Sequence, residues 1–213
     1  MSKVARAKPR SHEQRRRETQ KIVLDATLEV LIKRGYAKLT LADVAEAAGV
    51  SRGAQMNYFR TKIDLVNAAA RHAMVDAVHS AQSLAERASK SSDPLDSFLM
   101  DSEQFFLSKT YLAMIELAIA ARTDPLLGEK QVAITRGFRK SLNAIWLDLF
   151  VKAGYPKQQA EVFLKLTHYL FRGMALVAIW SPTKKEYRQL LHEWRSIIRE
   201  KVARRPGFLD TSA

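Results

Sequence analysis

Apolar positions recur along the chain at intervals of three and four residues, the spacing of helices that bury one face. No segment shows the alternation of apolar and polar residues that is typical of a half-buried β-strand. Glycine, proline and short polar runs break the pattern into nine predicted helices, so the sequence predicts an all-α protein. The expected helices span residues 13–34, 41–48, 52–58, 61–89, 94–107, 109–121, 126–153, 157–180 and 183–203.

The segment from Leu39 to Phe59 has the turn and cap residues of two short helices joined by a tight turn. Thr40 can cap the first helix, with Asp43 completing a capping box three residues later. Gly49 can adopt the left-handed conformation of the turn, and Ser51 can cap the second helix. This pattern predicts a DNA-binding helix-turn-helix, with an ordinary helical hairpin as the alternative.

Polar side chains suited to nucleic acid lie in and after the second of these helices. Arg52, Gln55 and Asn57 can hydrogen-bond base edges or phosphate oxygens. Thr61 can cap the next helix, and Lys62 lies in its first turn. Because a helix N-terminus is itself positive, a lysine beside it favours a phosphate.

The charge of the chain points to a polyanionic partner. The sequence holds 35 Lys and Arg against 22 Asp and Glu, a net charge of +13, with a pI of about 10.1. Residues 1–62, under a third of the chain, hold 14 basic and 6 acidic residues, a net charge of +8. Such a surplus suits nucleic acid or an anionic membrane surface. Its coincidence with the helix-turn-helix favours nucleic acid.

The order of these features predicts three parts. Residues 1–12 are polar and basic and are expected to form a disordered arm, residues 13–62 a helix-turn-helix domain, and residues 63–213 a larger helical domain. No apolar run approaches the roughly 20 residues of a membrane span, and the basic start has no apolar stretch behind it as a signal peptide would. The chain has no cysteine. We therefore expect a cytoplasmic protein.

Enzymatic function is not indicated. The five histidines are scattered, and the sequence has neither a glycine-rich phosphate loop nor a GxSxG motif. We therefore expect no catalytic residues, no metal and no cofactor. Two other readings stay open at this point: a ligand-independent basic DNA- or RNA-binding protein, and attachment to a membrane surface through the basic N-terminal helix.

A helix, a helix-turn-helix, a linking helix that opens with lysine, and a larger helical body together resemble the tetracycline-repressor (TetR) family of bacterial transcriptional regulators. The stretch GYAKLTLADVAEAAGVSRGAQMNYFRTKIDLV, from Gly35 to Val66, carries the resemblance. It implies a homodimeric DNA-binding regulator, by default a repressor, released from a palindromic double-stranded operator by a small-molecule effector. It also implies that the larger domain binds the effector and forms the dimer.

The resemblance assigns roles within the helix-turn-helix region. It implies that Thr40 and Lys62 contact phosphates and that the start of the second helix enters the major groove. Met56 stands where the family commonly has tyrosine, and Tyr58 where it commonly has histidine, so a phosphate contact at position 56 is lost. The predicted DNA contacts are Thr40, Ser51, Arg52, Gly53, Gln55, Asn57, Tyr58 and Lys62.

The resemblance also implies that the last two helices form the dimer. Both carry broad apolar stripes, which a monomer core would explain equally well. Gly173 inside the first of them would permit a close helix crossing. The predicted interface comprises Phe163, Leu166, Leu170, Gly173, Met174, Leu190, Leu191, Trp194 and Ile198.

A cavity between helices is the usual place for a ligand in a helical bundle. Glu116 lies in the apolar run YLAMIELAIAA, so we expect its carboxylate to be buried and paired with Arg172 or Arg122, or else to meet a cationic ligand. His168 lies one helical turn before Arg172. The predicted ligand contacts are Phe105, Met114, Glu116, Trp146, His168 and Arg172.

Overall fold

The computed structural model describes residues 11–90, 93–180 and 184–201, and all regular structure in these ranges is helical. The chain divides into two compact units, residues 1–70 and 71–213, here called unit 1 and unit 2. The division falls inside the fourth helix, later than the expected boundary at residue 62, so the first two turns of that helix belong to unit 1.

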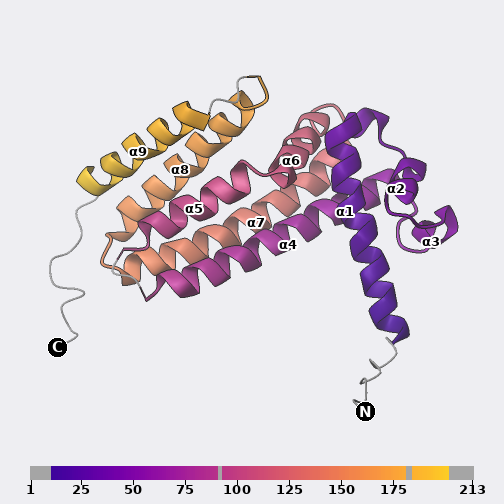
Figure 1. The fold of residues 1–213 in the computed structure, drawn as a ribbon, viewed down its shortest axis with the longest axis horizontal. Coiled ribbons are helices and arrows are strands. Elements are labelled where there is room, and N and C mark those ends of the chain that lie inside the picture. Colours follow the sequence, from indigo (N-terminus) through magenta and orange to yellow (C-terminus); the bar gives the residue numbers. More distant parts are fainter. Residues whose placement is uncertain (1–10, 91–92, 181–183, 202–213) are drawn as a thin grey trace, which may run out of the picture. The chain divides into compact units, whose positions relative to one another are not determined.

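Unit 1 consists of α1 (His12–Lys38), α2 (Leu41–Ala47), α3 (Arg52–Met56) and the start of α4 (Lys62–Ala88) (Figure 1). α2 packs against both α1 and α3. The buried apolar side chains that hold these helices together come from α1, α2, α4 and the segments that connect the helices, whereas the buried residue of α3 is Gln55. These apolar side chains are Val23, Leu24, Ala26, Val30, Leu31, Leu39, Val44, Ala45, Phe59, Leu65, Val66, Ala69 and Ala70.

The start of α1 differs from that of the expected helix. α1 starts at His12, because Ser11 and Gln14 form a capping box: the Ser11 hydroxyl accepts from the Gln14 N–H (3.1 Å) and the Gln14 amide accepts from the Ser11 N–H (2.9 Å). Placing residues 11 and 12 in a disordered arm was therefore wrong, and residues 1–10 lie outside the described ranges. At the other end, Gly35 is non-helical, with φ 73° and ψ 165°, so the long helix is interrupted there as predicted and a short segment continues to Lys38.

Unit 2 contains the rest of α4 together with α5 (Leu95–Phe106), α6 (Lys109–Ala120), α7 (Pro125–Lys152), α8 (Lys157–Val177) and α9 (Lys184–Lys201). α8 packs on α5 and α7, and α6 packs on α5 and α7 (Figure 1). α9 runs antiparallel to α8, since the Tyr187 hydroxyl donates to the Met174 carbonyl (2.9 Å) and Trp194 Nε1 donates to Thr167 Oγ1 (2.8 Å).

Aromatic rings fill the centre of unit 2. The Phe98 ring lies 5.4 Å from Trp146, 5.5 Å from Phe150 and 6.1 Å from Phe163, all edge-on, an arrangement that aromatic pairs favour. Trp146 is fully buried and its Nε1 donates to the buried carboxylate of Asp101 (2.8 Å). Trp146 and Phe163 are therefore core residues of unit 2, and because Phe163 is buried, predicting it as a dimer contact was wrong.

None of the helices in the described part of the chain combines the length and hydropathy that a membrane span requires.

Candidate nucleic-acid interface and ligand pockets

The first cap of the helix-turn-helix forms as the sequence predicts. Thr40 Oγ1 accepts from the Asp43 N–H (3.2 Å), and the Asp43 carboxylate accepts from the Thr40 N–H (3.1 Å) and hydroxyl (2.8 Å). Arg34 also donates to Asp43, at 2.6 Å. The Thr40 hydroxyl, then the Thr40 N–H and the Arg34 charge, hold the pKa of Asp43 below its usual value, although burial opposes the shift. The Thr40 hydroxyl is thus already engaged in starting α2.

The turn and the second cap also follow the prediction. Gly49 has a φ of 65°, which a residue with a side chain adopts only with strain. The Val50 N–H donates to the Ala45 carbonyl (3.0 Å), closing the end of α2. Ser51 Oγ accepts from the Ala54 N–H (3.1 Å) and starts α3.

α3 is shorter than expected and presents a different face. It ends at Met56, and the exposed residues at its start and end are Ser51, Arg52, Gly53, Met56 and Asn57.

Gln55, which we expected to reach a base edge, is only 1% exposed. The prediction was wrong because position 55 lies on the inner face of this five-residue helix, on the same side as the buried Phe59. Its Nε2 has no hydrogen-bond partner among the described residues, which costs free energy in a buried donor.

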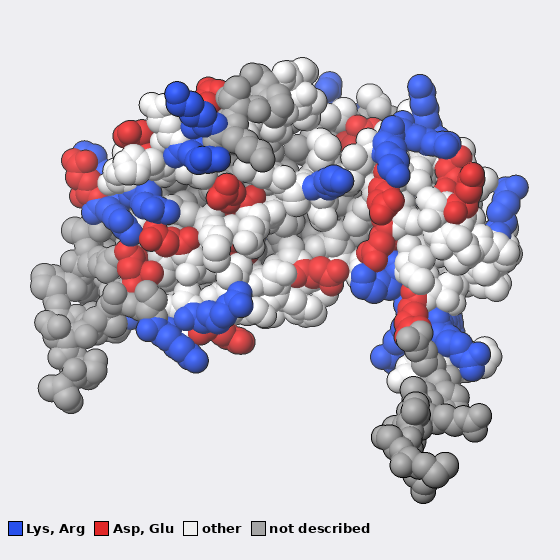
Figure 2. All heavy atoms as spheres, in the orientation of Figure 1, with Lys and Arg blue, Asp and Glu red and all other residues white. Residues whose placement is uncertain are grey.

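A concave surface, here called the α1 cleft, joins α1 to the end of α3. Its volume is about 420 Å³, and it is lined by His12, Arg15, Arg16, Thr19, Asn57 and Tyr58. The Arg16 guanidinium lies over the half-buried Tyr58 ring, 5.8 Å from its centroid. Lys and Arg side chains gather around the N-terminal part of α1 (Figure 2). Sequence reasoning identified Tyr58 but not its arginine partner.

Lys62 is held against the end of α1 by two contacts. Its Nζ donates to the Ala37 carbonyl (3.3 Å) and lies 4.2 Å from the centroid of the Tyr36 ring. The preceding Thr61 forms the predicted cap with Asp64, whose N–H donates to the Thr61 hydroxyl (3.1 Å). Lys62 therefore has a fixed position at the N-terminus of α4.

The predicted dimer residues separate into exposed and buried groups. Leu166 (48% exposed), Gly173 and Leu190 are exposed, whereas Met174 and Ile198, like Phe163, are buried in unit 2, so these three predictions were wrong. Leu170, Leu191 and Trp194 are half-buried. The exposed apolar stripe, here called the α8–α9 face, comprises Val162, Leu166, Tyr169, Gly173 and Val177 on α8 and Leu190 and Ile197 on α9.

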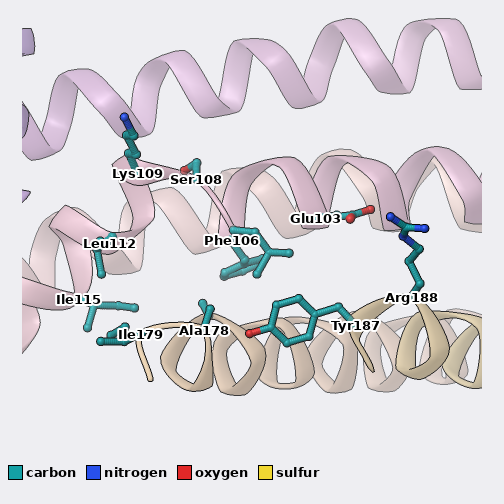
Figure 3. Close-up of a pocket in the computed structure, with 12 residues that line it drawn as sticks. Glu103, Phe106, Ser108, Lys109, Leu112, Ile115, Ala178, Ile179, Tyr187 and Arg188 are labelled. Atoms are coloured by element: carbon teal, nitrogen blue, oxygen red, sulfur yellow. The ribbon is translucent and has the colours of Figure 1, made fainter. Parts of the chain in front are cut away.

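One pocket of unit 2, here called the tyrosine pocket, lies among α5, α6, α8 and α9 (Figure 3). Its volume is about 580 Å³, and most of its lining is apolar. Phe106 and Tyr187 approach each other inside it, and Glu103 faces Arg188 across one end. The lining residues are Glu103, Phe106, Leu107, Ser108, Lys109, Leu112, Ile115, Ala175, Ala178, Ile179, Tyr187 and Arg188.

A second pocket of unit 2, here called the cationic pocket, lies among α4, α6 and α7 and has a volume of about 720 Å³. Buried Met74 and Met114 contribute apolar surface, and four cations lie around them. The lining residues are Met74, Met114, Ala118, Ala121, Arg122, Gly128, Gln131, Val132, Thr135, Arg136, Arg139, Lys140 and Asn143.

The predicted ligand contacts are dispersed in the structure. Met114 lines the cationic pocket, and the other five line neither of these two pockets. Glu116 is partly exposed, so the expectation of a buried carboxylate was wrong. Phe105 packs against Phe138, with ring centroids 5.1 Å apart. The Arg172 guanidinium lies over the rings of Phe106 and Tyr169, at 5.7 and 5.8 Å.

His168 is a buried core residue. Its ring lies 5.8 Å from Phe98 and 5.3 Å from Phe106. Burial, and then the charges of Arg172 and Arg139, lower the pKa of His168 to about 4. The ring is therefore neutral at physiological pH.

The sequence carried a signal for the cationic pocket that our prediction missed. Arg136, Arg139 and Lys140 recur at intervals of three and four, and no acidic residue lies three or four positions from any of them. Cations at that spacing share one helical face and repel each other.

Comparison with known proteins agrees with this geometry. A family model described as "Bacterial regulatory proteins, tetR family" matches residues 23–69. The chain is 31% identical, over 92% of its length and 97% of the relative's, to the HTH-type transcriptional regulator CymR of Pseudomonas putida. Two solved structures share the fold: a transcriptional regulator from Rhodococcus sp. Rha1 (TM-score 0.69, 21% identity, covering 88% of this chain and 99% of that one), and the multidrug binding protein EbrR complexed with imidazole (TM-score 0.60, 17% identity, covering 88% and 97%).

Proposed function

The chain belongs to the tetR family of bacterial regulatory proteins and is a helix-turn-helix transcriptional regulator, and from that premise we propose that it is a repressor. In this proposal it binds a palindromic operator as a homodimer and leaves it when unit 2 takes a small organic effector. We place this activity in the cytoplasm, where the DNA is.

The observation that carries the DNA-binding part is the capped α2–turn–α3 unit. Two cap hydrogen bonds and the left-handed Gly49 fix α3, so that Arg52, Met56 and Asn57 are displayed together on an exposed surface. Arginine can pair with guanine O6 and N7, asparagine with adenine, and an apolar side chain with the thymine methyl group. With Gln55 buried, we assign base reading to these three side chains.

We assign phosphate contacts to the groups that surround the three base-reading side chains. The Ser51 hydroxyl uses its oxygen as the α3 cap and keeps its proton for donation. Gly53 lets the backbone of α3 approach DNA closely, Lys62 supplies a charge at the α4 N-terminus, and the α1 cleft adds Arg15 and Arg16. These contacts position α3 without reading sequence.

The α8–α9 face supports the homodimer. The side chains of Val162, Leu166, Tyr169 and Val177, together with Gly173, form one stripe along most of α8 and are exposed in the monomer. A contiguous exposed apolar surface of this kind marks an interaction site. A second copy would cover it through a two-fold interface, which matches a palindromic operator.

Two pockets of unit 2 have volumes within the range of sites for small organic molecules. EbrR, a fold neighbour, is described as a multidrug binding protein. We therefore propose that unit 2 takes an effector and that the complex has lower affinity for the operator.

The test is selection of bound fragments from randomised DNA by the purified chain, repeated at 50 and 300 mM salt. We expect one enriched palindromic sequence that persists at the higher salt. A ligand-independent basic nucleic-acid-binding protein would instead enrich no sequence and would release DNA steeply as salt rises. That result would contradict the proposal.

A further inference from the structure

Three of the four cations of the cationic pocket lie on one stripe of α7. Arg139 and Lys140 follow Arg136 by three and four positions, and Arg122 joins them from the segment before α7. Like charges at this spacing destabilise a helix. The stripe therefore weakens the free protein unless something compensates the charge.

No described carboxylate compensates it. None of the four cations forms an ion pair within the described residues, and the residues lining the pocket include no acid. Elsewhere in unit 2, cations do find carboxylates: Lys152 pairs with Asp148 at 2.7 Å, and Arg195 with Asp96 at 3.0 Å. The positive charge of the pocket is thus a local property and not a consequence of the high pI alone.

Several other residues that line the pocket are apolar. Met74 of α4 and Met114 of α6 are buried, and Ala118 and Val132 extend their surface. Methionine adapts its shape to varied apolar groups. The Asn143 amide, whose buried Oδ1 has no hydrogen-bond partner among the described residues, lies one turn beyond Arg139 and can turn to a bound molecule.

We propose that the cationic pocket is the effector site and that the effector is an organic carboxylate with an apolar body. The body packs on Met74 and Met114, and the carboxylate accepts hydrogen bonds from Arg136 and Arg139. The geometry favours this pocket over the tyrosine pocket, where Glu103 faces Arg188 and shares the lining with Lys109, so that no comparable preference for an anion follows. The role of this pocket as an effector site rests on the proposed function, whereas the binding of a carboxylate there does not.

The pocket also touches the helix that matters for regulation. Met74 belongs to α4, whose first residues, including Lys62, lie in unit 1. A molecule that fills the space beside Met74 changes the packing of α4 in unit 2. This is the physical step through which occupancy would alter operator affinity.

Isothermal titration calorimetry of the full-length protein tests the proposal with two probe pairs, 2-naphthoate beside 2-naphthamide and decanoate beside decanamide. We expect at least one acid to bind at least about tenfold more tightly than its amide, since hydrogen bonds to charged groups are the stronger ones. The double variant Arg136→Gln, Arg139→Gln should remove that preference. Lys152→Gln, which removes an exposed cation from the same helix outside the pocket, should keep it.

Each other outcome overturns the proposal. Equal affinity for acid and amide in both pairs, or absence of binding by both acids, contradicts an anion site. The anion site lies elsewhere if the acid preference survives in the double variant and in both single variants, Arg136→Gln and Arg139→Gln. Thermal unfolding of each variant confirms that it is folded, and the exposed positions of these arginines make folding the expected result.

Operator binding separates this inference from the proposed function. If the protein selects an operator but shows no acid preference, the proposed function stands and the carboxylate site is refuted. If the protein prefers the acids but selects no operator, the carboxylate site stands and its role as an effector site is refuted.

Discussion

Two buried titratable residues of unit 2 respond to acid in opposite directions. His168 has a pKa of about 4 when folded, against about 6.5 when unfolded, so between these values the unfolded chain binds the extra proton and stability falls with falling pH. Burial raises the pKa of Asp101 from 3.8 to about 6, although the Trp146 hydrogen bond opposes the shift. The folded chain then binds the extra proton, and stability rises as pH falls from 6 to 4.

We predict that His168→Gln removes the acid-sensitive part of this balance. When the pH is lowered from 7 to 4.5, the free energy of unfolding of the variant should fall by about 2–3 kcal/mol less than that of the wild type. Urea unfolding at both pH values measures the difference. Asp101→Asn keeps an acceptor for the Trp146 hydrogen bond. On the same change of pH, its free energy of unfolding should fall relative to that of the wild type, because the variant lacks the stability that Asp101 gains in acid. A His168→Gln curve parallel to that of the wild type would refute the assignment.

At the α1 cleft, Arg16→Gln should weaken operator binding without changing sequence preference. The loss of one phosphate contact should reduce the slope of log affinity against log salt by about one. Gel-shift titrations at several salt concentrations measure this slope. Arg17→Gln is the matched control, because Arg17 pairs with Glu13 and does not line the cleft. Equal effects of the two variants would remove the cleft from the interface.

At the scale of the element, α3 allows stability and binding to be separated. A Cβ added at Gly53 meets no atom within 4 Å, so Gly53→Ala should stabilise the protein by roughly 0.5–1 kcal/mol. The same methyl group should reduce operator affinity, because Gly53 is exposed where α3 would approach DNA. Chemical unfolding and gel-shift titration measure the two effects. As a contrast, Gly49→Ala should destabilise the protein by about 1–2 kcal/mol, because Gly49 has a φ of 65°, which alanine adopts only with strain. Unchanged operator affinity in Gly53→Ala would contradict the close approach.

The start points of the helices were predictable because caps depend on residues three apart. Thr40, Ser51 and Thr61 each accept the backbone hydrogen bond that their spacing predicts. The face that a short helix presents was not predictable, because in α3 the packing of unit 1 decides whether Gln55 or Met56 points outward.

The same limit applies to α8 and α9, where Phe163 and Leu166 are both apolar and only three positions apart. One is buried and the other is exposed, and periodicity alone does not select between them on a helix with a broad apolar face. The cationic pocket was not predicted from the sequence, for a different reason. Its charged stripe is visible in the sequence, but Met74 and Met114 join it from distant helices.

At the scale of the whole molecule, the dimer is the feature on which operator recognition depends. Leu166→Glu places a charge in the middle of the α8–α9 face, where dimerisation would have to bury it. We predict a monomer in sedimentation analysis and operator affinity lower by roughly 10²–10⁴-fold, the gain that joining two binding modules supplies. Val151→Glu, at an exposed apolar position on α7, is the control and should remain dimeric. A dimeric Leu166→Glu protein would show that the interface lies elsewhere.

A dimer places two copies of α3 on one DNA molecule. For both to enter the major groove on one face of the duplex, their centres must lie about 34–36 Å apart, or one helical turn. An effector that alters this spacing lowers affinity without touching α3. In the function proposed here, recognition and release are therefore properties of the pair of chains, not of either alone.

Hydroxyl-radical footprinting on the selected DNA tests the central claim most directly. We predict two protected half-sites related by two-fold symmetry, with centres about one helical turn apart, both retained at 300 mM salt and both lost with Leu166→Glu. Protection that is uniform along any DNA and disappears as salt rises would contradict the account.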